Sequence, residues 1–257
     1  MLREAEKKKL VEELKKLGIQ KNDTLLVHSS MKALGEVCGG ADTVLDALME
    51  TVKDGLLVLP THTWASIRGE HLLFDPEMEP SCVGILTELF RKREGVYRSL
   101  HPTHSMAAWG REAKEYVDAD LNWSDTPCAR EGCWGELYRR KAKILLLGCG
   151  LNRNTYMHAV EEWNAISGRL CEEREPMQVR MPDGSVRERK MCRHFKPNGI
   201  SISESYVKME PLLLERGIAR KGRIKQAECL LCDAVQEADF VTECLKRQPD
   251  LFSEALD

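Results

Sequence analysis

Apolar and polar positions follow one another along this chain in blocks that predict strands joined by helices. Two short apolar runs, DTLLVHSS (23–30) and GLLVLPTHT (55–63), are typical of buried strands that end in polar loops. Between them, ADTVLDALMETV (41–52) places its apolar residues at helical spacing. This strand–helix–strand order within the first quarter of the chain indicates a parallel sheet with a crossover helix.

Further blocks extend this α/β pattern. The run KILLLGCG (143–150) is the clearest buried strand, and VGILTELFRKREG (83–95) is typical of a helix that ends at a glycine. The first 18 residues form an amphipathic helix pattern with four apolar residues on one side, namely Leu10, Val11, Leu14 and Leu17. Residues 64–82 contain two prolines and predict an extended surface loop.

The pattern changes after about residue 170. MQVRMPDGSVRERKMCR (177–193) alternates on both sides of Pro-Asp-Gly, which predicts a β-hairpin, and most of the remainder has helical periodicity. We therefore expect a three-layer α/β sandwich with a central, mainly parallel sheet, an embedded hairpin and a helical C-terminal part. We expect a single domain over residues 1–257, with the segment 170–195 and the helical part 200–257 packed on it.

Composition and charge argue against nucleic acid and membrane as partners. The chain has 38 basic and 41 acidic residues, a net charge of −3, so it lacks the basic excess of a nucleic-acid-binding protein. No run approaches the ~20 apolar residues that cross a bilayer, and the charged N-terminus has no signal-peptide centre. We expect a cytoplasmic protein that binds neither nucleic acid nor membrane. Homo-oligomerisation stays open.

Polar residues follow three of the predicted strands at the point where each ends. They are His28-Ser29-Ser30, Thr61-His62-Thr63, and Asn154 through Glu162. Ligands of open α/β sheets bind outside the carboxyl ends of the strands. The sequence therefore predicts one cleft lined by these three loops.

His158 is the leading candidate for chemistry. Asn154 or Thr155 is placed to cap a helix N-terminus, which puts His158 in the first turn with Glu161 one turn further on. A carboxylate beside an imidazole fixes its tautomer, as a general base requires. Taken alone, the pattern fits a histidine bonded to a backbone carbonyl, with solvated glutamates, better than it fits a base. A metal at H-x-x-E is disfavoured because the second histidine of H-E-x-x-H is missing.

Other motifs are weaker. Neither phosphate-binding glycine motif, G-x-x-x-x-G-K-[ST] or G-x-G-x-x-G, occurs, and there is no G-x-S-x-G elbow. Arg98 suits a phosphate or a surface acid equally well. His101 and His104 are candidate ligands or bases, although a histidine before proline is also a constrained structural position. Cys149 lies among apolar residues, and this predicts an inert thiol.

Ten cysteines are scattered over the chain, and only Cys229 and Cys232 form a close pair. We interpret AECLLCDAV as a helix with two buried thiols. The alternative is a zinc site that adds Cys192 or His194, for which the pair has suitable spacing but lacks a matching second pair.

Five motifs taken together resemble the aminoglycoside 3-N-acetyltransferase family. In order they are HSSMKALGEVCGGADTVLDAL, GLLVLPTHTW, FDPEMEPSCVGILTELFRKREGVYRSLHPTHSMAAWG, TPCAREGCWGEL and KILLLGCGLNRNTYMHAVEE. The resemblance is close over about residues 10–165 and looser over the C-terminal third. It implies an acyltransferase that uses acetyl-CoA as co-substrate, needs no metal and confers antibiotic resistance.

The resemblance also implies roles for individual residues. His158 resembles the general base and Glu161 the acid that orients it, with direct acetyl transfer to an amine and no acyl-enzyme. Seven positions resemble the family's coenzyme-binding residues, namely His28, Ser29, Ser30, Met31, Arg98, Ser99 and Ser105. Thr61 and Glu162 are the expected acceptor-binding residues.

The acceptor is less closely defined by the resemblance than the acetyl transfer. The segment LNWSDTPCAREGCWGEL departs from the phenylalanine-glycine step common in the family, which implies a different edge of the cleft. Asp118, Asp120 and Asp125 are candidates for contact with a polyamine, or are solvated loop carboxylates. The alternatives are an acetyltransferase of the same fold that acts on another amine, and a non-catalytic CoA- or metal-binding protein.

Overall fold

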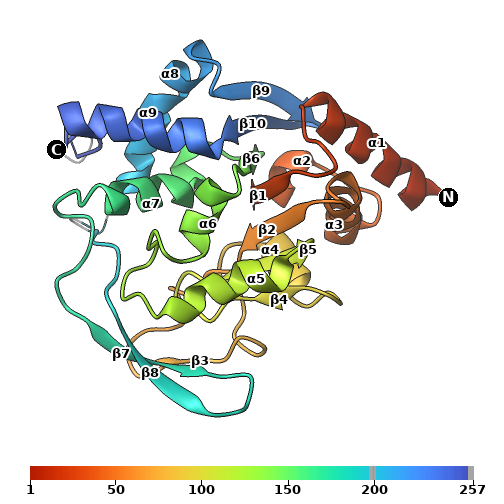
Figure 1. The fold of residues 1–257 in the computed structure, drawn as a ribbon. Coiled ribbons are helices and arrows are strands. Elements are labelled where there is room, and N and C mark those ends of the chain that lie inside the picture. The colour runs from red at the N-terminus through yellow and green to blue at the C-terminus, as the bar shows by residue number, and fades with distance from the viewer. Residues whose placement is uncertain (197–198, 200, 254–257) are drawn as a thin grey trace.

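A computed structural model describes residues 1–196, 199 and 201–253, and its centre is a seven-stranded sheet (Figure 1). The strands in spatial order are β4 (Tyr97–Arg98), β5 (Met106–Gly110), β2 (Leu56–Pro60), β1 (Thr24–Ser29), β6 (Lys143–Leu147), β10 (Ala227–Asp233) and β9 (Ala219–Ile224). β1 pairs in parallel with both β2 and β6. The strands outside these three run antiparallel to their neighbours, so the sheet is mixed around a parallel centre. The predicted α/β class is confirmed.

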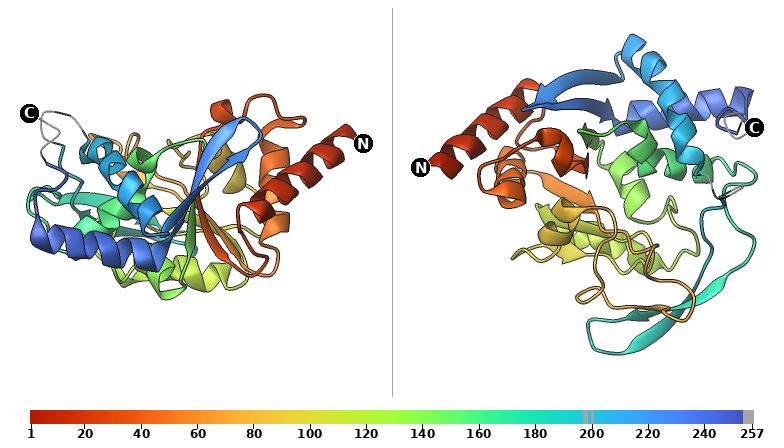
Figure 2. Two further views of the ribbon diagram at one scale, coloured as in Figure 1. Left: turned by 90° about the horizontal axis from the view of Figure 1, so that it is seen from above. Right: turned by 180° about the vertical axis from the view of Figure 1, so that it is seen from behind.

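Helices cover both faces of the sheet, as the view from above shows (Figure 2). One face packs against α1 (Leu2–Lys16), α2 (Met31–Leu34), α3 (Gly40–Thr51) and α4 (Ile85–Phe90). The other face packs against α5 (Ala113–Asp118), α6 (Cys133–Arg139), α7 (Thr155–Trp163), α8 (Glu210–Glu215) and α9 (Ala234–Arg247). Leu25 and Val27 of β1 enter the first core and Leu26 enters the second, because successive strand side chains point to opposite faces.

The N-terminal helix follows the predicted amphipathic pattern. Leu10, Val11, Leu14 and Leu17 are all buried against the sheet and α3. In the part of the chain that the structure describes, no helix has both the length and the apolar character needed to cross a bilayer.

The predicted hairpin forms a second, smaller sheet at one end of the molecule (Figure 1). β7 (Glu175–Arg180) pairs antiparallel with β8 (Val186–Met191) around the Pro-Asp-Gly turn. A third strand, β3 (Leu73–Phe74), comes from the predicted loop 64–82 and pairs in parallel with β7. Phe74, Met177, Val179 and Met191 are fully buried in a separate small core.

The prediction of a helix around Cys229 and Cys232 is wrong. α8, α9 and the 3₁₀ segment Ile202–Met209 are helical as expected, but 219–233 forms the β9–β10 hairpin. β10 lies between β6 and β9 and is covered on both faces, so its apolar run does not alternate with polar residues. A short apolar run of this kind does not distinguish a buried strand from a buried helix.

The strand geometry also excludes the zinc site that the pair suggested. Cys229 packs in the core beside α1 and α3, whereas Cys232 packs in the core on the opposite face. Three residues apart on a strand, the two thiols point in opposite directions and do not share an ion. Residues 200 and 254–257 of the expected helical part 200–257 lie outside the described residues, as do residues 197 and 198.

Candidate active site

The three predicted loops meet at one edge of the central sheet. β1, β2 and β6 are neighbouring parallel strands, so their carboxyl ends lie together. His28, the penultimate residue of β1, lies opposite Leu146 of β6, and the Ser30 amide donates to the Leu147 carbonyl at 2.8 Å. Residues 61–63 follow β2, and α7 follows β6.

The start of α7 is fixed by the predicted cap. Asn154 Oδ1 accepts a hydrogen bond from the amide of Tyr156 at 3.2 Å, which satisfies one of the free N–H groups of the first turn. Asn154 Nδ2 donates to Oε1 of Glu237, a buried carboxylate on α9, at 2.6 Å. Asn154 therefore ties the helix that carries His158 to the C-terminal helix.

His158 and Glu161 are joined through a tyrosine. Nδ1 of His158 lies 2.7 Å from the Tyr206 hydroxyl, and that hydroxyl donates to Oε2 of Glu161. The direct separation of Nδ1 and Oε2 is 3.9 Å, which is too long for a hydrogen bond. Because the phenol has one proton and gives it to the carboxylate, Nδ1 of His158 is the protonated ring nitrogen and donates to the phenol. The other ring nitrogen, Nε2, is then an acceptor.

The carboxylate of Glu161 is held from its other side by Arg169. Arg169 Nε donates to Oε1 of Glu161, and its NH2 group donates to Ser253 Oγ at 3.0 Å. Glu161 is fully buried, and burial raises its pKa above 4.5 while Tyr206 and Arg169 act in the opposite direction. The charge of Arg169 and the two hydrogen bonds favour an ionised carboxylate at neutral pH.

His158 is neutral and partly accessible. Burial lowers its pKa well below 6.5, and neighbouring imidazoles and Arg169 act in the same direction. Its side chain keeps 15% of its surface exposed, and Nε2 has no hydrogen-bond partner among the described residues. A neutral imidazole with a free Nε2 and a fixed Nδ1–H has the arrangement of a general base.

His158 belongs to a cluster of buried imidazoles. Its ring stacks on His194 at 4.5 Å between centroids, His194 lies 4.9 Å from His104, and His104 lies 4.6 Å from His62. Burial lowers the pKa of His194 to about 3 and that of His104 and His62 well below 6.5. The cluster therefore consists of uncharged rings, which places no permanent positive charge beside His158.

His101 has a structural place at the edge of this cluster. Its Nδ1 accepts from the amides of Thr103 and His104 at 3.3 and 2.9 Å, so Nε2 carries the proton and donates to the Thr126 carbonyl at 3.1 Å. Both nitrogens are thus engaged in holding loops, and burial lowers the pKa of His101 to about 4.

The expected coenzyme residues fall into two groups. Ser29, Ser30 and Met31 are partly exposed at the turn from β1 into α2. A cavity of about 550 Å³ is lined by Ala33 of α2, by the Gly148–Gly150 turn that leads toward α7 and, for the most part, by residues of the β9–β10 hairpin. The first group is therefore partly accessible, although none of its three residues lines this cavity.

The second group is buried. Arg98 donates to the carbonyls of Thr61, Pro76 and Glu79 at 2.8, 3.0 and 2.6 Å, and to the hydroxyls of Thr61 and Ser105 at 3.2 Å. Thr61, Ser99 and Ser105 are at most 1% exposed, and His28 is 6% exposed. Arg98 and its partners hold the loops after β2 and around β3 in place, whereas Nε2 of His28 is buried without a hydrogen-bond partner among the described residues.

Glu162 and the loop aspartates already have partners. Glu162 accepts from the Thr126 hydroxyl and from the Cys128 amide, and burial raises its pKa to about 7. Asp118 pairs with Lys114 at 2.6 Å, Asp125 pairs with Arg174 at 2.6 Å, and Asp120 is buried and accepts from the Cys133 amide at 3.0 Å.

Tyr206 and Arg169 are the site residues that sequence reasoning missed. Tyr206 stands 45 residues beyond Glu161 in a segment without a chemical motif, and Arg169 lies in an irregular segment after α7. No local pattern in the sequence points to either residue. A buried Glu161 needs partners that its own helix does not supply, but this requirement does not identify them.

Comparisons with known proteins agree with this fold. A family model described as aminoglycoside 3-N-acetyltransferase matches residues 26–246. An aminoglycoside N(3')-acetyltransferase-like protein YokD of Bacillus subtilis is 31% identical over 60% of this chain, and the match spans less than two thirds (64%) of that relative. Aminoglycoside N(3)-acetyltransferase III of Salmonella sp. is 30% identical over 93% of this chain and 91% of its own length. The crystal structure of aminoglycoside acetyltransferase AAC(3)-Xa superposes with a TM-score of 0.81 at 25% identity, covering 93% of this chain and 92% of that one. This chain belongs to the aminoglycoside 3-N-acetyltransferase family.

Proposed function

We propose that this chain is an acetyl-CoA-dependent N-acetyltransferase of a single domain. Its acceptor is an amino group, in the first instance the 3-amino group of an aminoglycoside's deoxystreptamine ring. Family membership supports the class of reaction. The single observation that carries the mechanism is the hydrogen-bonded order His158–Tyr206–Glu161, which leaves Nε2 of His158 free to accept a proton.

In the proposed reaction, the acceptor amine attacks the thioester carbonyl while Nε2 of His158 removes its proton. A carbon–nitrogen bond forms, the carbon–sulfur bond breaks, and the imidazolium returns its proton to the departing thiolate. The Nδ1–H of His158 stays bonded to Tyr206, and the buried charge of Glu161 stabilises the imidazolium through the phenol. No acyl-enzyme is needed, since the base activates the amine directly.

The donor side of the proposed site is the turn that contains Ser29, Ser30 and Met31. Their partial exposure supports a position along the pantetheine and thioester. Hydroxyl groups at this turn are suited to stabilise the oxyanion that develops on the thioester carbonyl. We assign an indirect role to Arg98, Ser99, Ser105, Thr61 and His28, because their burial supports positioning of the loops around the coenzyme.

Replacement of the proposed base tests the mechanism. His158→Ala is expected to lower kcat by roughly 100-fold or more, the range for loss of a general base, while CoA binding measured by calorimetry is retained. Acetyl transfer is followed by release of free thiol from acetyl-CoA. His71→Ala is the matched control, because His71 is an exposed histidine paired with Glu79 outside the cluster. Full activity of His158→Ala would refute the role of His158.

A second acceptor class is favoured by the pairing of the acids. An aminoglycoside carries several positive charges, whereas Asp118 and Asp125 are already paired with Lys114 and Arg174 in salt bridges. This arrangement suits an amine of lower charge, such as a biosynthetic intermediate. A panel of aminoglycosides and simple primary amines, compared by kcat/KM, distinguishes the two. Turnover of the amines with none of the aminoglycosides would select the second class.

A further inference from the structure

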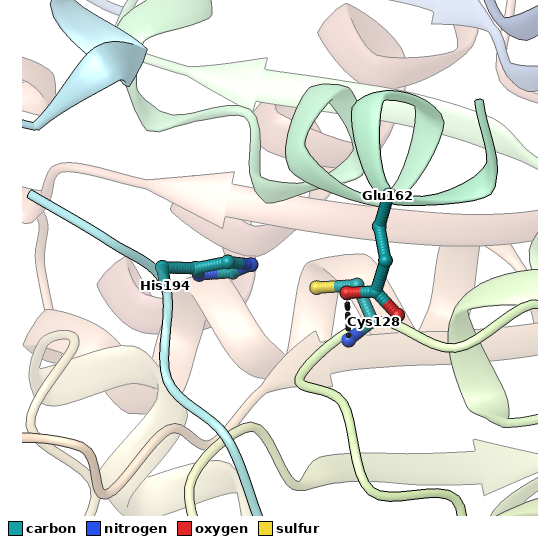
Figure 3. A group of neighbouring side chains, drawn as sticks. All are labelled: Cys128, Glu162 and His194. Atoms are coloured by element: carbon teal, nitrogen blue, oxygen red, sulfur yellow. Dashed lines mark hydrogen bonds between the residues drawn. The ribbon is translucent and has the colours of Figure 1, made fainter. Parts of the chain in front are cut away.

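Three side chains of kinds that bind metal ions lie together beside His158, the proposed base, and have no part in the proposed acetyl transfer. Cys128 comes from the loop before α6, Glu162 from α7 and His194 from the segment after β8 (Figure 3). One ligand atom from each, a sulfur, a carboxylate oxygen and a ring nitrogen, lies within 4.8 Å of the other two. The ring of His194 and the sulfur of Cys128 point toward one another in Figure 3.

The burial and the hydrogen bonding of these three side chains suit metal ligands. Cys128 is fully buried, and Nε2 of His194 is buried without a hydrogen-bond partner in the described structure. A buried ring nitrogen of this kind is destabilising unless something satisfies it. Glu162 is held in place by the Thr126 hydroxyl and the Cys128 amide, which occupy one lone pair on each oxygen and leave the others free.

We propose that Cys128, Glu162 and His194 form a binding site for a divalent transition-metal ion of the zinc type. A thiolate, an imidazole and a carboxylate are ligands that Zn²⁺ accepts together in a tetrahedral site. Zinc ligands lie roughly 2.0–2.3 Å from the ion, so the three atoms need to approach one another by about 1 Å, which small side-chain rotations supply. The bonds of Thr126 and of the Cys128 amide to Glu162 are the outer contacts that orient a ligating carboxylate.

The charge balance of the site changes when the ion binds. Burial and the nearby Glu162 carboxylate raise the pKa of the Cys128 thiol well above 9.0, so the free site holds a neutral thiol. Binding replaces the thiol proton by the metal: Cys128–SH and M²⁺ give a metal–thiolate bond and one released proton. No oxidant or reductant takes part.

Occupation of this site has a consequence for the neighbouring base. His194 stacks on His158 at 4.5 Å, so the ion brings positive charge close to the ring that has to accept a proton. Positive charge lowers the basicity of that ring, and three protein ligands leave a fourth position open on the ion. Zinc therefore inhibits acetyl transfer. This consequence rests on the proposed function, whereas metal binding itself does not.

Cobalt(II) titration of the purified full chain tests the binding. We expect one Co²⁺ per chain with a thiolate-to-metal charge-transfer band, and Zn²⁺ should displace it. Cys128→Ser should abolish the band, and His194→Gln should weaken binding at least tenfold. Cys244→Ser is the matched control, because this half-buried thiol lies on α9 outside the set, and it should bind as the wild type does. Circular dichroism checks that each variant is folded.

Two results would overturn the site. One is the absence of a thiolate band in the wild type, and the other is a band of full strength in both Cys128→Ser and His194→Gln. The activity measurement is separate: Zn²⁺ should inhibit the wild type and Cys244→Ser but not Cys128→Ser. An inactive wild type that still binds cobalt refutes the proposed function alone. An active wild type without the band refutes the metal site alone.

Discussion

The Tyr206 hydroxyl lies 2.7 Å from Nδ1 of His158 and donates its proton to the buried Glu161 carboxylate. This single contact fixes which ring nitrogen of His158 carries a proton. Without it, either tautomer is available to the ring, and the orientation that exposes Nε2 is no longer held. Tyr206 is a positioning residue, since it acts through His158 and not on the substrate.

Removal of this hydroxyl should slow the chemistry without changing coenzyme binding. Tyr206→Phe is expected to lower kcat by about 10–100-fold, part of the contribution of a general base, with KM for acetyl-CoA within about twofold. The measurement is steady-state kinetics over a range of pH. Tyr138→Phe is the control, because Tyr138 donates to Asp239 at the surface. Equal kcat values for Tyr206→Phe and the wild type would show that the phenol does not orient the base.

The buried histidines should make the fold sensitive to acid. Burial lowers the pKa of His28 and His101 to about 4 and that of His194 to about 3. Between pH 6.5 and these values the unfolded chain binds more protons than the folded one. The free energy of unfolding therefore falls as the pH is lowered, by up to about 1.4 kcal/mol per pH unit for each histidine. Glu161, Glu162 and Glu237 oppose this above pH 4.5, up to about pH 7 for the last two, because burial raises their pKa and the folded chain then binds more protons.

Histidines outnumber these glutamates in the buried interior, so the net effect is a loss of stability in acid. Denaturant unfolding at pH 7, 6 and 5 measures the slope. His28→Leu removes one of these histidines. It should lower the slope of the free energy of unfolding against pH by up to about 1.4 kcal/mol per pH unit. Stability that rises from pH 7 to pH 5 would contradict the assignment of neutral imidazoles.

Local signals were enough to predict the elements that carry the site. The apolar runs at β1, β2 and β6 are short, continuous and followed by polar residues, and each is a strand of the parallel centre. Asn154 caps α7 as its position in the sequence predicts. These features depend on residues a few positions apart, which is the range over which sequence pattern is informative.

Long-range contacts were beyond the same reasoning. Tyr206 donates to Glu161, which lies 45 residues earlier in the chain, and His194 stacks on His158 from a different segment. No spacing in the sequence predicts either contact. The β10 strand was mistaken for a helix because both of its faces are covered. Arg98 illustrates a further difficulty, since a guanidinium has the same appearance in the sequence whether it contacts a ligand or, as here, backbone carbonyls in the interior.

The cap of α7 should matter for both stability and catalysis. Asn154→Ala removes the bond to the Tyr156 amide, worth about 1 kcal/mol, and leaves Glu237 buried without its donor, which costs about 1–3 kcal/mol more. Denaturant unfolding measures the loss, and kcat should fall because the turn that carries His158 is no longer anchored. Asn152→Ala is the matched control, because Asn152 bonds the exposed Glu204 and should be nearly neutral.

Arg98 and Ser30 separate a structural role from a coenzyme-binding role. Arg98 is surrounded by backbone carbonyls and hydroxyls that match a planar guanidinium, and a lysine does not reproduce these five contacts. Arg98→Lys should lower the free energy of unfolding by roughly 2–4 kcal/mol because buried acceptors lose their donors. Its KM for acetyl-CoA should change little.

Ser30→Ala should show the opposite pattern. Ser30 is partly exposed at the turn from β1 into α2, so loss of its hydroxyl is expected to raise KM for acetyl-CoA several-fold with the stability within about 0.5 kcal/mol of the wild type. Unfolding and coenzyme kinetics are measured on both variants under the same conditions. If Arg98→Lys instead raised KM strongly while the fold kept its full stability, the guanidinium would have to contact the coenzyme. The buried network around Thr61 would then have to open when the coenzyme binds, since every donor of Arg98 that the structure places is directed at the protein.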